Sequence, residues 1–277
     1  MAHGHYSDLP LTRESVQKAH EVIKPYIHLT PVLTSHSLND IVSNLTDTSS
    51  GTGSDHNAES ANLQYELYFK CENFQKIGAF KARGAFFNVM TLDEDCARKG
   101  VCTHSSGNHA QALALAAKTR KIPAHIVMPT ISTPSKMAAT RGYGAHVHLS
   151  GSTSSEREAV LASVKDNTGA TFIPPYDYLG TILGQGTVAL ELEQQVGEMT
   201  NHGESGKGTL DAVIAPLGGG GLLGGIVSHS TRCESLVCEK LTFTGNSLVR
   251  PEWARQRTAC LWRRAVSRGM EAEFKYS

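Results

Sequence analysis

The chain has 277 residues, of which 40% are hydrophobic, so it can bury one large core or two smaller ones. Its 26 lysines and arginines balance 26 aspartates and glutamates, which leaves no net field to recruit nucleic acid or an anionic membrane and favours small-molecule ligands. No apolar run reaches the roughly 18 residues that a membrane helix needs. The N-terminus also lacks an apolar stretch behind a basic head. We therefore expect a cytoplasmic protein with neither a nucleic-acid nor a membrane partner.

Six cysteines, at positions 71, 96, 102, 233, 238 and 260, lie far apart and form no C-x-x-C pair. This spacing predicts reduced thiols, as in a cytosolic protein, rather than a disulfide frame or a zinc site. No metal site is predicted.

The first predicted helix lies in the stretch TRESVQKAHEVIKPY, where Thr12 is the expected N-cap and Pro25 the expected stop. Residues 46–62 and 200–209 contain almost no large apolar side chain, and both are predicted to be surface insertions. From residue 65 to residue 217, strand-like and helix-like segments alternate: YELYFK, the helix after Lys81, GVCTHS, HAQALALAAKTR, AHIVMP, KMAATRGYG, AHVHLS, SEREAVLASVKDNTG, TFIPPY, TVALELEQQVG and DAVIAPL. This alternation predicts βαβ units, parallel sheets and an α/β fold.

The stretch IGAFKARGAFFNVM places Lys81 directly after Phe80, with Phe86 and Phe87 further along the same segment. A lysine taken alone is most often a solvated surface charge. An apolar setting, however, lowers the pKa of a lysine amine, and such an amine forms a Schiff base with a carbonyl compound. Lys81 is therefore a candidate nucleophile.

The stretch THSSGNHAQALALAAK sets a polar turn between a predicted strand and a predicted helix. Its members are Ser105, Ser106, Gly107, Asn108 and His109. Hydroxyls, a side-chain amide and the free backbone amides of a helix N-terminus can together bind a carboxylate. An ordinary Ser/Asn helix cap is the alternative.

The stretch DAVIAPLGGGGLLGGI runs a predicted strand into four consecutive glycines, Gly218 to Gly221, and then into an apolar helix. Glycine permits close backbone approach, and the first amides of a helix point outward, so such a loop can cradle a phosphate. A tight, closely packed turn is one alternative. Another is a dinucleotide-dependent oxidoreductase, because the glycines at 219, 221 and 224 satisfy G-x-G-x-x-G and Glu239 follows about twenty residues on. No second strand of a βαβ unit is predicted after the loop, which weighs against the oxidoreductase.

A Schiff-base lysine and a phosphate-cradling loop match the two ends of pyridoxal phosphate, its aldehyde and its phosphate. From about Ser15 to Val227 the chain resembles the fold-type II pyridoxal-phosphate enzymes, specifically the serine racemase and serine/threonine dehydratase branch. The motifs that carry this resemblance, in the family's order, are FKCENFQKIGAFKARGA, THSSGNHAQALALAAK, GYGA, PPYDYLGTILGQGT and APLGGGGLLGGI.

The resemblance implies an α/β, two-domain architecture like that of tryptophan synthase β, with parallel-rich twisted sheets and flanking helices. A large cofactor domain would combine residues 1–99 and 178–228, and a small α/β domain would span residues 100–177. Residues 229–277 would form a divergent basic tail. Family members are commonly homodimers, so a homodimer is expected.

The resemblance also implies roles for single residues. Lys81 would form the internal aldimine and act as base, and Ser106 would be the second acid/base on the opposite face of the cofactor ring. The implied cofactor-binding residues are Phe80, Lys81, Asn108, Gly218, Gly219, Gly220, Gly221 and Leu222. The implied substrate-binding residues are Ser105, Ser106, Asn108 and His109, with Arg157 as a supporting charge.

The implied reaction is a pyridoxal-phosphate-dependent β-elimination (deamination), a racemisation, or both. The implied substrates are serine, threonine or a related 3-hydroxy amino acid such as 3-hydroxyaspartate. Serine at position 106 favours a racemase or a eukaryotic-type dehydratase, because many threonine dehydratases have alanine there.

The clean alternation of elements, and the resemblance with it, stops after about Val227. Relatives continue for several more strands and helices, including acidic residues that bind a divalent cation, and no such cation site is found in this sequence. We therefore expect unpaired core strands, low stability and weak activity. A catalytically impaired, truncated homologue is thus an alternative to an active enzyme.

Overall fold

The computed structural model describes residues 9–47, 64–200, 210–229, 235–239, 243–244 and 247–248. In chain order the elements are α1 (Arg13–Ile23), the 3-10 turn η1 (Lys24–Tyr26), β1 (Val32–Leu33), α2 (His36–Asp47), β2 (Phe69–Lys70), η3 (Glu72–Phe74), η4 (Lys76–Gly78), α3 (Lys81–Met90), α4 (Glu94–Lys99), β3 (Val101–His104), α5 (Asn108–Arg120), β4 (Ala124–Pro129), α6 (Pro134–Gly142), β5 (His146–Ser150), α7 (Ser154–Thr168), β6 (Thr171–Phe172), α8 (Leu179–Met199), β7 (Ala212–Pro216), α9 (Gly221–His229), β8 (Ser235–Glu239), β9 (Phe243–Thr244) and β10 (Ser247–Leu248).

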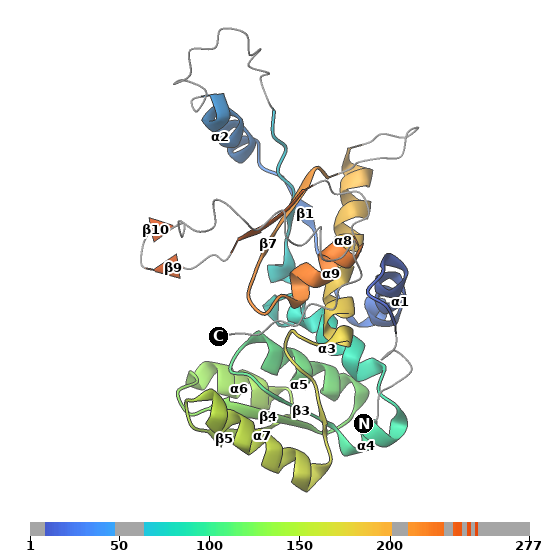
Figure 1. Ribbon diagram of the computed structural model, residues 1–277, viewed down its shortest axis with the longest axis vertical. Coiled ribbons are helices and arrows are strands. Elements are labelled where there is room, and N and C mark those ends of the chain that lie inside the picture. The colour runs from blue at the N-terminus through green and yellow to red at the C-terminus, as the bar shows by residue number, and fades with distance from the viewer. Residues whose placement is uncertain are drawn as a thin grey trace.

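The lower half of the molecule in Figure 1 is built on a four-stranded parallel sheet with the order β5-β4-β3-β6. Successive side chains of β4 face opposite sides of this sheet. Ile126 and Met128 join the cluster that includes α5, whereas Val127 packs with Leu161 and Val164 of α7. The turn after β3 lies at the carboxyl edge of the sheet, which is where ligands bind in open α/β folds.

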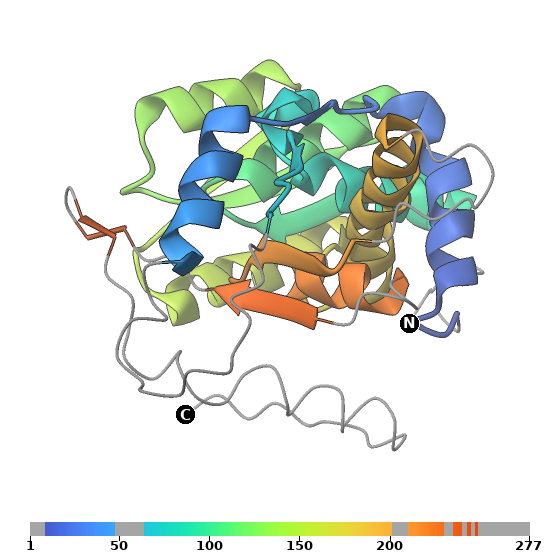
Figure 2. The same cartoon turned by 90° about the horizontal axis from the view of Figure 1, so that it is seen from above.

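The upper half is built around the long helix α8, which packs against α1, α3 and α9 (Figure 2). Glycines allow the closest of these contacts. A Cβ at Gly184 of α8 would lie 2.7 Å from the Cα of Gly84 in α3, and one at Gly225 of α9 would lie 2.5 Å from the backbone nitrogen of Gly186. The backbones of α3, α8 and α9 are therefore in direct contact, which fixes the start of α3 relative to the start of α9.

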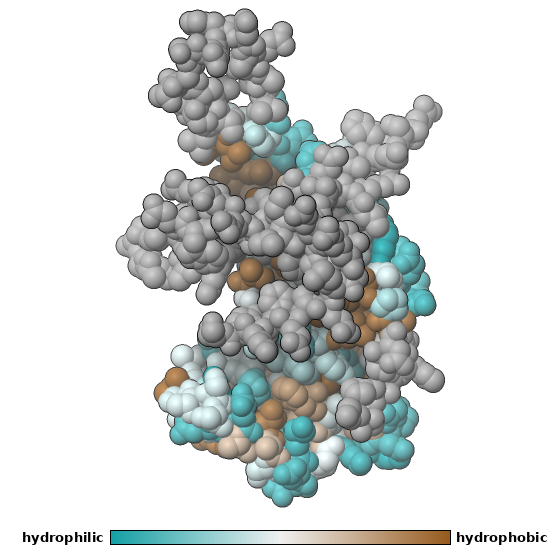
Figure 3. Space-filling view, viewed as in Figure 1, coloured by the Kyte–Doolittle hydropathy of each residue, from teal (hydrophilic) through white to brown (hydrophobic). Residues whose placement is uncertain are grey.

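Shorter elements lie around this helical group. β1 pairs with β2 and β9 with β10, both antiparallel, and α2 extends away from the rest of the chain (Figure 1). Several large apolar side chains of this region are exposed, among them Leu33, Ile41, Phe69 and Ile214. Figure 3 shows hydrophobic surface beside α2 in the upper part of the molecule.

The predicted alternation of strands and helices is confirmed, and with it the α/β class. Thr12 caps α1, because its Oγ1 accepts a hydrogen bond from the backbone nitrogen of Ser15 at 3.3 Å, and the helix ends at Ile23, just before Pro25. The predicted strand YELYFK is shorter than expected. Only Phe69 and Lys70 pair, because their partner β1 is itself two residues long.

One expectation is wrong: a second strand does follow the glycine loop. β8 pairs in parallel with β7 along its whole length, so β7, α9 and β8 form a βαβ unit. The apolar run SLVCE is short, and its pairing with β7 is a long-range contact that the local pattern does not display.

The predicted insertions at 46–62 and 200–209 and the tail at 229–277 fall largely outside the described residues. No helix within the described ranges is long and apolar enough to cross a membrane.

Candidate active site

Lys81 is the first residue of α3, and the turn before it is tightly constrained. Ile77 and Gly78 both have positive φ, at 61° and 72°, so the chain reverses sharply just before the helix starts. The Nζ of Lys81 donates a hydrogen bond to the backbone oxygen of Pro175 at 2.5 Å and lies 5.2 Å from the centre of the Phe80 ring. Burial lowers the pKa of Lys81 to about 8. A neutral, nucleophilic amine is therefore available at mildly alkaline pH.

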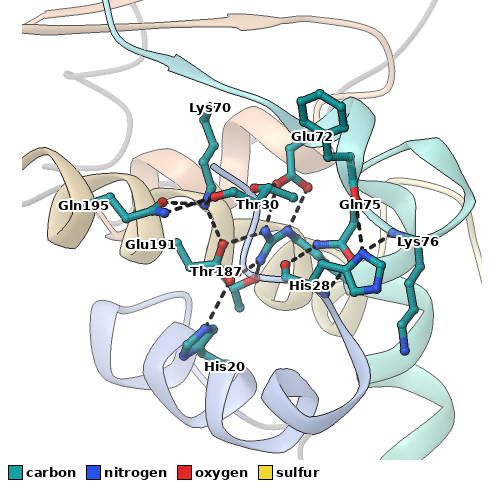
Figure 4. A network of polar contacts seen from close by, with 12 residues as sticks. His20, His28, Thr30, Lys70, Glu72, Gln75, Lys76, Thr187, Glu191 and Gln195 are labelled. Carbon is teal, nitrogen blue, oxygen red and sulfur yellow. Dashed lines mark hydrogen bonds and ion pairs between the residues drawn. The ribbon is translucent and has the colours of Figure 1, made fainter. Parts of the chain in front are cut away.

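A buried ion network holds the first turn of α3 in place (Figure 4). Arg83 is fully buried and donates to both carboxylate oxygens of Glu72, at 2.8 Å each, and to both of Glu191, at 2.8 and 2.7 Å. Lys70 adds a second cation, 2.7 Å from Glu191. Burial alone would raise the pKa of Glu191, but hydrogen bonds from His20 and Arg83 outweigh it and lower the pKa to about 2. Two carboxylates thus face two cations, and the guanidinium of Arg83 is hydrogen-bonded to both carboxylates.

The four glycines form the turn between β7 and α9, and α9 begins at Gly221. Gly220 has a φ of +80°, which favours glycine. The ring of Tyr176 lies against Gly219, where a Cβ would come within 2.1 Å of a ring carbon, and a Cβ at Gly221 would lie 2.8 Å from the Tyr176 backbone oxygen. Leu222 is buried with the core residues of β7 and α9, so only its backbone amide can face a ligand.

The segment of residues 173–176, between β6 and α8, connects Lys81, the polar turn and the glycine loop. Its three successive carbonyl oxygens each have a side-chain partner: Ile173 with the Nε2 of His109 at 3.0 Å, Pro174 with the Oγ1 of Thr181 at 3.0 Å, and Pro175 with Lys81. The next residue is Tyr176, which lies on Gly219. Sequence reasoning gave this segment no role; the only signal was the motif PPYDYLGTILGQGT, whose two prolines cannot use their own nitrogens as donors.

The polar turn lies between β3 and α5 as expected. The backbone nitrogen of Ser105 donates to Val127 at 3.1 Å, and its Oγ accepts from Gly107 at 3.3 Å. Ser106 is half-buried and Asn108, in the first turn of α5, is exposed, so both can meet a ligand. His109 is buried, and burial lowers its pKa to about 4, so its imidazole is neutral. The Nε2 of His109 bonds Ile173, so a carboxylate contact from this residue would come through its backbone amide or through Nδ1, which has no partner among the described residues.

Arg157 lies on a different element from the polar turn, near the residue that precedes it. It lies on α7, where its Nη2 donates to Ser154 of the same helix at 2.8 Å. Burial and then the charge of Arg157 lower the pKa of His104, the residue just before the turn. The hydrogen bonds found in the described part of the chain do not join Arg157 to Ser105, Ser106 or Asn108. No group of three His, Cys, Asp or Glu side chains there is placed to hold a metal ion either.

Comparison with known proteins identifies the family. A profile described as "Pyridoxal-phosphate dependent enzyme" matches residues 55–234. A serine racemase of Arabidopsis thaliana is 45% identical over 212 residues, covering 76% of this chain and 54% of the relative. The chain belongs to the pyridoxal-phosphate-dependent enzymes. The L-threo-3-hydroxyaspartate ammonia-lyase of Saccharomyces cerevisiae is 43% identical over 214 residues, covering 77% of this chain and 56% of that enzyme.

Solved structures place the chain among the fold-type II members of this family. The structure of maize serine racemase matches with a TM-score of 0.69 and 39% identity, covering 82% of this chain and 60% of that one. The threonine deaminase of T.th. matches with a TM-score of 0.64 and 37% identity, covering 79% of this chain and 60% of that one. The chain thus spans a little over half the length of the relatives it matches.

The residues of this pyridoxal-phosphate-dependent family member fit the cofactor. A desolvated amine suits an aldehyde, and the turn of four glycines before α9 offers backbone amides without side chains that would cover them, which suits a phosphate. The side chain of Gln185, fully buried between α3 and α9, has an amide without a partner in the part of the chain that the structure describes, as expected where a ligand completes the hydrogen bonding. The βαβ unit would also suit a dinucleotide, but the family assignment favours pyridoxal phosphate over that alternative.

Proposed function

We propose that this chain holds pyridoxal phosphate and catalyses β-elimination, racemisation or both on serine, threonine or 3-hydroxyaspartate. The observation that carries the proposal is the Lys81 amine. Burial lowers its pKa to about 8, and the segment that accepts its hydrogen bond, residues 173–176, also lies against the glycine loop. Relatives named serine racemase, L-threo-3-hydroxyaspartate ammonia-lyase and threonine deaminase support this substrate class.

The cofactor would be held at two ends. Lys81 would bond its aldehyde carbon, and the backbone amides of Gly218 to Gly221 and Leu222 would bind its phosphate, because the first amides of α9 lack partners within the helix. Phe80 would pack beside the ring and Asn108 would donate to the ring oxygen. When bound, the cofactor supplies an electron sink that makes the α-proton of the amino acid acidic.

The chain's own residues would then bind the substrate and move the proton. Ser105, Asn108 and the amide of His109 would hold the carboxylate, with Arg157 as a more distant positive charge. Lys81 would take the α-proton, which its lowered pKa permits near neutral pH. A proton delivered by Ser106 from the other face would invert the α-carbon. Loss of the β-hydroxyl instead would lead to a keto acid and ammonia.

The test is a product assay on the protein loaded with pyridoxal phosphate. L-serine, D-serine, L-threonine and L-threo-3-hydroxyaspartate are supplied separately, and keto acid, ammonia and enantiomer are measured. We expect keto acid from at least one substrate, and any racemisation should be lost in Ser106→Ala while elimination remains. A cofactor-loaded protein that releases neither product from all four amino acids would contradict the proposal.

We further propose a two-lobed homodimer in a reducing, cytosolic environment. The lobes would be residues 1–99 with 178–228 and residues 100–177, the second containing the four-stranded sheet. Exposed apolar side chains such as Phe69 and Ile214 support association, because a partner would cover them. The thiols of Cys71 and Cys102, which form no disulfide, support a reducing compartment. Light scattering that gives the mass of a single chain would contradict the dimer.

A further inference from the structure

Gln185 lies in the first half of α8 with its side chain fully buried, and within the described residues neither Nε2 nor Oε1 has a hydrogen-bond partner. Its buried neighbours on the same helix are satisfied: Thr181 bonds Pro174 and Asn88, and Glu191 bonds Arg83 and Lys70. A buried amide that lacks both partners destabilises a protein, and such a group is most often explained by a ligand or an ordered water.

The amide of Gln185 lies between the two helices that would hold the cofactor. Its Nε2 is 3.3 Å from the Cβ position of Gly84, one turn after Lys81 on α3, and its Oε1 is 3.0 Å from the Cβ position of Gly221, where α9 starts. Gly184 and Gly186 flank it and let the backbones of α3 and α9 approach α8 closely. The side chain is thus confined to the space between the lysine and the glycine loop.

We propose that Gln185 is a further phosphate-binding residue of this site. A phosphate dianion presents only acceptor oxygens, so it needs donors, and the Nε2 of Gln185 carries two N–H groups. The Oε1 faces the first turn of α9, whose backbone N–H groups are donors without helical partners. Because neither end of this amide is hydrogen-bonded within the described residues, a half-turn of the group that brings Nε2 to the Gly221 side breaks no hydrogen bond, and the nitrogen can then donate to the anion. This inference rests on the proposed cofactor function.

The test compares two ligands that differ only in the phosphate, pyridoxal phosphate and pyridoxal, by titration followed in visible absorbance. Gln185→Met keeps the size of the side chain without donors, and Gln185→Glu adds a negative charge. Gln194→Met is the control, because Gln194 is exposed on the same helix and donates to Glu198, one turn further along. In Gln185→Met we expect pyridoxal phosphate to bind about tenfold more weakly and pyridoxal to bind within about twofold of the unaltered protein. Gln185→Glu should weaken pyridoxal phosphate further, and Gln194→Met should change neither ligand.

Equal losses for both ligands, or none for either, would overturn the role of Gln185. If the unaltered protein binds the two ligands equally well, the proposed phosphate site itself fails, so the two failures can be told apart. Thermal melting without cofactor gives an independent reading. The Gln185→Met variant removes two unpartnered polar atoms, so its melting temperature should equal or exceed that of the unaltered protein. Inorganic phosphate should raise the melting temperature of the unaltered protein, and it should raise that of the variant by less. A large fall in the melting temperature of the cofactor-free Met variant would instead show that protein groups satisfy the amide, and would overturn the proposal.

Discussion

Lys81 and Lys70 are both largely buried, yet their surroundings suit them to different tasks. Lys70 is paired with the carboxylate of Glu191 at 2.7 Å, so its charge is compensated. The hydrogen bond of Lys81 goes to a neutral carbonyl, that of Pro175, and burial therefore lowers its pKa to about 8. An amine of this kind loses its proton easily, which a nucleophile or a base requires and a structural ion pair does not.

The first prediction concerns the pH dependence of cofactor capture. Only the neutral amine attacks an aldehyde, so the rate of capture should rise with pH and level off above a midpoint near the Lys81 pKa of about 8. Stopped-flow absorbance between about pH 6.5 and 10 measures this midpoint. A midpoint close to 10.5, the ordinary value for lysine, would show that Lys81 is not desolvated.

The second prediction concerns the buried ion network. Glu191→Gln leaves Arg83 and Lys70 buried beside a neutral amide, which should cost about 3–5 kcal/mol of unfolding free energy. Glu94→Gln is the matched control, because Glu94 pairs with Arg120 on the surface, where its side chain is 80% exposed. The control should lose no more than about 1 kcal/mol. Urea denaturation compares the two, and similar losses would contradict the structural role of the network.

Single residues divide clearly into those that local sequence reveals and those that it does not. Lys81, the glycines and the polar turn stand out because each is locally unusual. The partners of Arg83 do not, since Glu191 lies 108 positions away along the chain. The buried, neutral state of His109 was equally hidden, because it depends on residues that the fold brings around the imidazole, and this burial lowers its pKa.

At the scale of elements, the separation between α3 and α9 is set by glycines on α8. Gly184 meets Gly84 and Gly186 meets Gly225, so three helices cross with their backbones in contact. Lys81 begins α3 and the glycine loop leads into α9. The close packing of both helices on α8 therefore fixes the separation between the lysine and the loop.

The third prediction tests that packing. In Gly184→Ala the new methyl group would lie 2.7 Å from the Cα of Gly84 and 2.8 Å from the Arg83 carbonyl, so α3 must shift. We expect a loss of about 1–3 kcal/mol of stability and weaker cofactor binding. Gly197→Ala, on the same helix with no atom of the described residues within 4 Å of the new Cβ, should instead stabilise by about 0.5–1 kcal/mol. Thermal melting measures both, and equal signs would contradict the account.

The order of the elements followed from hydrophobic pattern, but their pairing did not. GVCTHS, AHIVMP and AHVHLS are strands as predicted, because each is a short apolar run bounded by turn residues. β8 was missed and β2 was overestimated, because both depend on which distant strand is available as a partner.

At the scale of the whole molecule, one buried and two half-buried histidines link stability to pH. Burial lowers the pKa of His109 to about 4, and burial together with neighbouring histidine charges lowers the pKa values of His125 and His148. His125 and His148 lie side by side on β4 and β5, with ring nitrogens 3.1 Å apart. In the unfolded chain these groups regain the ordinary value of 6.5, so between that pH and the lowered values the unfolded state binds more protons.

The fourth prediction follows from that difference. Stability should be constant near pH 7 and fall as the pH drops from about 6.5 toward 4, by roughly 3 kcal/mol for His109 alone. His125→Gln should flatten part of the slope. Denaturation at a series of pH values measures the slope, and stability that rises on acidification would contradict the burial of these imidazoles.

The most direct test of the account is to locate the cofactor on the chain. The protein is mixed with pyridoxal phosphate, reduced with borohydride, digested and mapped by mass spectrometry. We predict one phosphopyridoxyl adduct, on Lys81, that is absent from Lys81→Ala and needs no excess of reagent. An adduct spread over exposed lysines such as Lys18 and Lys118, with Lys81 unmodified, would contradict the central claim that Lys81 is the cofactor's anchor.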